Sequence, residues 1–180
     1  MMKVERFCLE AAMVDRFYLE AAMKEAEDAF NQRTYPVGAV IVDPSGEIIG
    51  RGHNQVYSKG DFTSHAEVEA IRGACGKLML EQNYEQCTLY TTYEPCIMCC
   101  GAIFHARIAR VVWVKEDKDF GAFQPVWEDT EFLKKSRKYP KLRGEHAACC
   151  EELEQKMEQW MMAWDAMKNE VLGEWKSRGQ

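Results

Sequence analysis

The chain has 180 residues, 47% of them hydrophobic, and its 29 acidic and 23 basic side chains give a formal net charge of -6. This length fits a single domain with an adequate core, and the acidic balance argues against broad, non-specific binding to phosphate. Because no apolar run approaches the roughly 20 residues that span a bilayer and the N-terminus lacks a signal-peptide core, we expect a cytoplasmic protein with no membrane partner.

The N-terminus carries a nearly exact tandem repeat, 6–13 and 16–23, with a ten-residue period. Ten helical steps of about 100° rotate a stripe by about 80°, so one straight helix cannot turn both copies toward the same core. Only the second copy continues into an apolar stripe, formed by Leu19, Ala22, Met23, Ala26 and Phe30. We therefore expect an N-terminal extension over 1–15, a main domain over 16–145 and a C-terminal helical segment over 146–180.

Strand and helix patterns alternate in the middle of the chain. The expected elements are a hairpin over 37–50, a helix from Ser64 as its N-cap, a strand over 88–92, a helix with Pro95 in its first turn and a strand over 110–114. Two strand-then-helix passages predict α/β layers, with ligands bound where helix N-termini meet strand ends. The direction of a fifth strand is left open.

The last third predicts a short helix near 127–135 and a long one from about Glu145. Apolar residues of the long helix alternate spacings of four and three, at Leu153, Met157, Trp160, Trp164, Met167 and Val171. Such a seam packs on the core or on a partner subunit; alternatively, it covers a substrate. A basic run over 134–143 holds six Lys or Arg residues and no acid, which suits a solvated face or a phosphate contact.

Three side chains suit a catalytic zinc ion. His65 supplies an imidazole, while Cys96 and Cys99, three residues apart, share one helix face. Three protein ligands leave a fourth position for water. Cys100 follows Cys99 and would point about 100° away from it on a helix, so we leave Cys100 out of the ligand set. If Cys100 were instead the fourth ligand, the zinc would be structural and the protein a binding module.

Glu67 lies two residues from His65, where a carboxylate can move protons between water and a leaving group. Ser64 and Glu67 also match a capping box, in which the carboxylate only satisfies the backbone. The neighbouring zinc ligands favour the catalytic role.

His-x-Glu followed by Pro-Cys-x-x-Cys is the signature of zinc deaminases. Over about 35–119 the chain resembles the cytidine/deoxycytidylate deaminase superfamily, through Gly38-Ala39-Val40, Asn54, 63–67, 88–92, 94–99 and 101–103. The resemblance implies a three-layer α/β/α domain with a central mixed five-stranded sheet and a long C-terminal helix. It also implies one zinc ion per chain, a homodimer, and hydrolytic release of ammonia in which zinc activates water and Glu67 transfers the protons.

The resemblance implies further site residues. Asp119 would assist proton transfer, because 116–119 matches a Glu-x-x-Asp of bacterial guanine deaminases. Contacts with the substrate are expected from Asn54, Ala66, Glu94 and Phe120, and also from Trp164, because the apolar seam of the C-terminal helix suits closure over a small flat ring. On local sequence alone Asn54 is equally a turn former.

Three branches of the superfamily are similar to this chain: guanine deaminases, fungal-type cytosine deaminases and tRNA wobble adenosine deaminases. The cysteine helix over 101–108 resembles the tRNA branch. The acidic balance and the lack of that branch's Asn-His-Arg segment and paired-Phe helix argue against it. We therefore expect a free nucleobase or nucleoside as the partner, guanine (to xanthine) ahead of cytosine (to uracil). The alternative is a tRNA deaminase that makes inosine.

Overall fold

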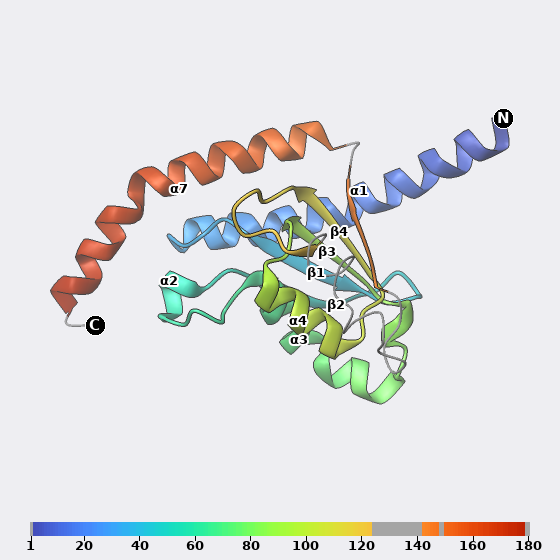
Figure 1. The fold of residues 1–180 in the computed structure, drawn as a ribbon, viewed down its shortest axis with the longest axis horizontal. Helices are drawn as coiled ribbons and strands as arrows, with labels where there is room; N and C mark the ends of the chain where they lie inside the picture. The colour runs from blue at the N-terminus through green and yellow to red at the C-terminus, as the bar shows by residue number, and fades with distance from the viewer. Residues whose placement is uncertain (1, 124–141, 148–149, 179–180) are drawn as a thin grey trace.

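A mixed five-stranded sheet forms the centre of the computed structural model, which describes residues 2–123, 142–147 and 150–178 (Figure 1). The strands are β1 (Gly38–Val42), β2 (Ile48–His53), β3 (Thr88–Tyr93), β4 (Arg110–Lys115) and β5 (Arg143–His146). The helices are α1 (Met2–Asn31), α2 (Val56–Lys59), α3 (Ala66–Glu81), the 3₁₀ turn η1 (Tyr84–Gln86), α4 (Ile97–Ala106) and α7 (Glu151–Arg178). The predicted fold class is confirmed.

The strands lie in the order β2-β1-β3-β4-β5. β1 pairs antiparallel with β2 and β3, whereas the β3–β4 and β4–β5 pairs are parallel. The predicted hairpin between β1 and β2 closes through Asp43, whose Oδ1 accepts hydrogen bonds from the backbone N–H groups of Ser45 and Glu47. The parallel β3–β4 pair requires a crossover, which α4 supplies.

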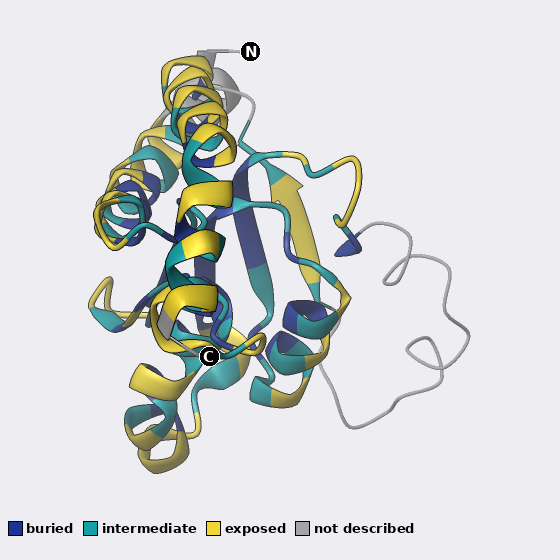
Figure 2. Ribbon diagram, turned by 90° about the vertical axis from the view of Figure 1, so that its left-hand side faces the viewer, coloured by how far each residue is buried: buried dark blue, intermediate teal, exposed yellow. Residues whose placement is uncertain are grey.

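Helices cover both faces of the sheet because strand residues alternate in direction. On β4, Val111 and Trp113 pack in the layer of α3 and α4, while Val112 and Val114 pack in the layer of α1 and α7. Figure 1 shows these two helix pairs on opposite sides of the sheet, and Figure 2 shows buried central strands under helices with exposed outer faces. Within the described ranges no helix is both long and apolar enough to cross a membrane.

Both copies of the repeat lie on one continuous helix, α1. Leu19 and Ala22 of the second copy are fully buried, whereas Met13 of the first copy is 65% exposed. Asp15 nevertheless contacts the sheet, because its Oδ1 accepts hydrogen bonds from Tyr90 Oη at 2.8 Å and Arg110 Nη1 at 2.7 Å. The domain boundary after residue 15 stays a prediction.

The long C-terminal helix begins at Glu151, not near Glu145, because the preceding residues pair with β4 as β5. Three seam residues, Met157, Trp164 and Val171, are buried in contacts with the same chain. The predicted helix near 127–135 and most of the basic run lie outside the described residues. Arg143, the last member of that run, lies on β5.

We expect Gly38→Ala to destabilise the domain, because an added Cβ would lie 2.2 Å from Ala22 O and 2.3 Å from Ala26 N of α1. Overpacking against backbone atoms should lower the free energy of unfolding by roughly 2 to 3 kcal/mol in a urea titration. Gly76→Ala on α3 is the control, since a Cβ there meets nothing within 4 Å, and it should stabilise by about 0.5 to 1 kcal/mol. An unchanged urea midpoint for Gly38→Ala would disprove the close packing of α1 on β1.

Candidate active site

Two helix N-termini bring the predicted zinc ligands together. His65 is the N-cap of α3 and Cys96 the N-cap of α4, so each helix begins slightly later than predicted. Nδ1 of His65 lies 3.7 Å from Sγ of Cys96 and 3.6 Å from Sγ of Cys99. All three ligand atoms lie within 4.8 Å of one another.

These separations suit a tetrahedral zinc ion. Zn–N and Zn–S bonds of about 2.0 and 2.3 Å at tetrahedral angles place the nitrogen about 3.5 Å from each sulfur, close to the distances found here. A hydrogen bond between the two sulfurs lowers the pKa of Cys96 to about 4 and, with burial, raises the pKa of Cys99, so Cys96 is the first of the two to form the thiolate that binds metal. Cys100 directs its Sγ to the carbonyl oxygen of Pro95 at 3.5 Å, which supports leaving it out of the ligand set.

Glu67 is 3% exposed and lies directly beside the ligands. Its Oε1 accepts a hydrogen bond from Thr91 Oγ1 at 3.3 Å, and its Oε2 lies 3.3 Å from Sγ of Cys99. Burial raises the pKa of Glu67, so the carboxyl group can carry a proton at higher pH than an exposed glutamate. The capping box does not form, because the N-cap of α3 is His65 and not Ser64, and the Glu67 carboxylate contacts Thr91 and Cys99.

The predicted substrate contacts on this side of the sheet are buried. Asn54, just past the end of β2, is 3% exposed, and Ala66 at the start of α3 is fully buried. Oδ1 of Asn54 accepts hydrogen bonds from Thr34 Oγ1 at 2.9 Å and Val56 N at 3.0 Å. Sequence reasoning missed the partner threonines, Thr34 and Thr91, because nothing in their local sequence indicates which side chain the fold brings to them.

Glu94 organises the loop that follows β4. Its carboxylate accepts hydrogen bonds from the backbone N–H groups of Phe123 at 3.1 Å and Asp117 at 3.4 Å. Asp119 and Phe120 lie on this loop with exposed side chains, Phe120 at 74%. The loop reaches the metal-ligand helix through a bridge between Gly121 and Cys96. The substrate roles of Glu94 and Phe120 and the catalytic role of Asp119 stay predictions.

Trp164 is fully buried on α7. Its ring packs against Tyr35 and Tyr57, with centroid distances of 5.3 and 4.9 Å. The structure thus gives Trp164 a packing role, and its predicted stacking on a base stays a prediction.

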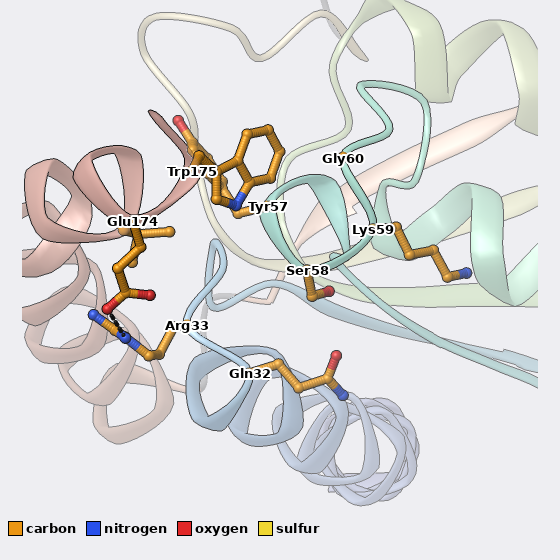
Figure 3. Close-up of a pocket in the computed structure, with 9 residues that line it drawn as sticks. Gln32, Arg33, Tyr57, Ser58, Lys59, Gly60, Glu174 and Trp175 are labelled. Carbon is orange, nitrogen blue, oxygen red and sulfur yellow. Dashed lines mark hydrogen bonds and ion pairs between the residues drawn. The ribbon is translucent and has the colours of Figure 1, made fainter. Parts of the chain in front are cut away.

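A separate cavity of about 670 Å³ lies where the end of α1 and α2 meet the last turns of α7 (Figure 3). Tyr57, Lys59 and Trp175 line it together with Arg33, whose guanidinium pairs with Glu174 at 2.7 Å. Its lining includes neither the zinc ligands nor Glu67. The chemistry therefore belongs to the cluster at the two helix N-termini.

The chain matches known proteins over its central part. Residues 13–115 match the family described as the cytidine and deoxycytidylate deaminase zinc-binding region. The tRNA-specific adenosine deaminase of Aquifex aeolicus (strain VF5) is 44% identical over 106 residues, which cover 59% of this chain and 69% of that protein.

Two solved structures are also similar. One, from a study of A-to-I editing by tRNA:A34 deaminases at the wobble position of transfer RNA, matches with a TM-score of 0.65 and 31% identity, covering 79% of this chain and 99% of that one. The guanine deaminase of Bacillus subtilis matches with a TM-score of 0.52 and 38% identity, covering 64% and 76%.

The preference for a free nucleobase as the substrate is wrong. Relatives named tRNA-specific adenosine deaminases share 37% to 44% identity with the chain, and the tRNA:A34 deaminase structure matches more of it than the guanine deaminase does. Net charge misled that prediction, since it sums the whole surface and does not exclude a local contact with phosphate. The family match encloses both ligand motifs and the first four strands, so the chain belongs to the zinc-binding cytidine and deoxycytidylate deaminase family.

Proposed function

We propose that this protein is a zinc-dependent tRNA deaminase that converts adenosine to inosine and releases ammonia. The observation that carries the proposal is the similarity to proteins named tRNA-specific adenosine deaminases, at 37% to 44% identity. The likeness to a tRNA:A34 deaminase structure over 79% of the chain supports it. The ligand spacing at His65, Cys96 and Cys99 supports the metal requirement.

In the proposed mechanism, His65, Cys96 and Cys99 would hold the zinc ion, which would supply an activated water as the nucleophile. Glu67 takes one proton from that water and delivers it to the ring nitrogen as the C–O bond forms. It then takes the second proton, from the hydroxyl group now on the ring carbon, and delivers it to the amine, which leaves as ammonia when the C–N bond breaks and the C=O bond forms. Its buried position supports this shuttle, because the raised pKa lets the carboxyl group hold a proton between the two transfers. Thr91 orients the shuttle through its hydrogen bond to Oε1.

The N-terminus of α4 contributes electrostatically. Cys96 is the N-cap of this ten-residue helix, and the free backbone N–H groups of a first turn carry partial positive charge. In our proposal these groups stabilise negative charge that develops on the base during attack. A homodimer remains a prediction.

A substrate panel tests the proposed function. The zinc-loaded protein should release ammonia and form inosine with tRNA, and should leave free adenosine, guanine and cytosine at background rates. Binding to tRNA should weaken steeply between low and high salt, with a slope of roughly -0.7 to -0.9 in log K against log salt concentration for each phosphate contact. The same panel with Glu67→Gln controls for contaminating deaminases. Faster turnover of free guanine than of tRNA adenosine would refute the proposal.

A further inference from the structure

Thr34 connects the end of α1 to Asn54 through a buried hydrogen bond. It follows Arg33, whose φ of 55° is left-handed and ends the helix, and its own N–H donates to Ala29 O at 3.2 Å. The Thr34 side chain is fully buried. Its Oγ1 lies 2.9 Å from Oδ1 of Asn54 and 3.2 Å from the backbone nitrogen of Tyr57.

Backbone groups fix the direction of both hydrogen bonds. The N–H of Tyr57 can only donate, so Oγ1 of Thr34 accepts from it and uses its own proton for Asn54. The N–H of Val56 also only donates, so the side-chain atom of Asn54 that it contacts at 3.0 Å is the oxygen. Oδ1 therefore accepts twice. Within the described part of the chain, no hydrogen bond uses Nδ2 of Asn54, which keeps both donors for another partner.

Asn54 lies alongside the segment that carries His65. The N–H of Gln55 donates to the carbonyl oxygen of Ser64 at 2.8 Å. On the other side of Asn54, Gly52 packs so closely on α3 that an added Cβ would lie 2.3 Å from Ala66 O. Asn54 is therefore held between two contacts with the residues on either side of the histidine ligand.

The C-terminal helix supports the same network from outside. Trp164 of α7 packs on the rings of Tyr35 and Tyr57. Tyr35 follows Thr34 in the chain, and the backbone N–H of Tyr57 donates a hydrogen bond to the Thr34 hydroxyl. Lys168 of α7 donates to the hydroxyl of Tyr35 at 3.2 Å. Packing of the Tyr57 ring on Trp164 therefore holds in place the backbone N–H that orients the Thr34 hydroxyl.

We propose that Thr34 is a positioning residue for substrate recognition. By occupying Oδ1 of Asn54 together with Val56 N–H, it turns the amide so that Nδ2 presents two donors toward the substrate beside the metal ligands. The site then selects a base or ribose that offers a hydrogen-bond acceptor at that position and disfavours one that offers a donor. This inference rests on the proposed function, since it concerns recognition at the same site.

Thr34→Val tests the role of the hydroxyl, because valine keeps the shape and removes the donor. With one of the two hydrogen bonds that fix Oδ1 removed, the Asn54 amide should be held less firmly and bind the substrate less well, and KM for tRNA should rise about 10-fold with kcat and zinc content little changed. Thr34→Ser restores the hydroxyl and should restore KM. Val42→Ala, a buried truncation in the other layer, controls for lost stability, and it should lower the urea midpoint without changing KM.

Asn54→Asp tests the donor itself. A carboxylate still accepts from Thr34 and Val56, so the fold should hold, but it offers an acceptor where the amide offered donors, and kcat/KM should fall by about 100-fold. In an Asn54→Ala background, Thr34→Val should change kcat/KM no further, because positioning acts only through Asn54. An active wild type with an unchanged KM for Thr34→Val would refute the inference alone, whereas a wild type inactive on tRNA would refute the proposed function.

Discussion

Glu67→Gln is expected to keep zinc at about one ion per chain and to lower kcat by about 10² to 10⁴-fold, the usual contribution of a positioned acid–base group. Glutamine has the same shape and can still accept the hydrogen bond from Thr91, so the site should keep its geometry. It cannot take up a proton from water and return it to the leaving amine. Single-turnover ammonia release on tRNA, with metal analysis of the same sample, measures both quantities.

Glu69→Gln is the matched control for that variant. It makes the same change two residues along α3, where the carboxylate pairs with Lys59 and Arg72 outside the site. Loss of such partly exposed pairs costs little stability, about 1 kcal/mol or less, and kcat should stay near the wild-type value. Ammonia release by Glu67→Gln at a rate close to that of Glu69→Gln would remove Glu67 from the mechanism.

Cys96→Ala and Cys99→Ala should each abolish zinc binding and activity together. Two remaining ligands hold zinc far more weakly than three. At the start of α4, each of these two sulfurs lies within 3.7 Å of His65 Nδ1. Chelation should likewise remove activity from the wild type, and added zinc should restore it. Metal content per chain and ammonia release on the same preparations test the prediction.

Cys100→Ala separates a catalytic from a structural zinc. Cys100 is fully buried and directs its sulfur to Pro95 O, so its loss should cost about 1 kcal/mol of stability and leave zinc content and turnover unchanged. If Cys100→Ala lost the metal, a fourth sulfur would belong to the shell and the open position for water would not exist. Full zinc content in Cys96→Ala would contradict the ligand set itself.

What the sequence prediction got wrong or left open depends on where distant segments and charges lie in the folded chain, which local patterns do not show. The start of the long helix was placed near Glu145 because helical periodicity does not show that Arg143–His146 pair with a distant strand. The N-terminal extension was given no secondary structure by the sequence, and the structure shows that α1 runs through both copies of the repeat while Leu19 and Ala22 of the second copy are buried and Met13 of the first is exposed. The free-base substrate was inferred from the net charge, which does not say where on the surface the charges lie, and from the lack of an Asn-His-Arg segment and a paired-Phe helix in the C-terminal third.

The sequence by itself determined what depends on spacing within a few residues: the β1–β2 hairpin, the strand alternation, and the two short motifs that place an imidazole, a carboxylate and two thiols at helix starts. These follow from local geometry, since residues three apart on a helix or two apart on a strand have fixed relative directions. Only the tertiary structure decided the direction of β5, the burial of Trp164, and the contacts of Asn54 with Thr34 and of Glu67 with Thr91. Those contacts join segments twenty or more residues apart, and which polar group meets which is settled by how the layers pack.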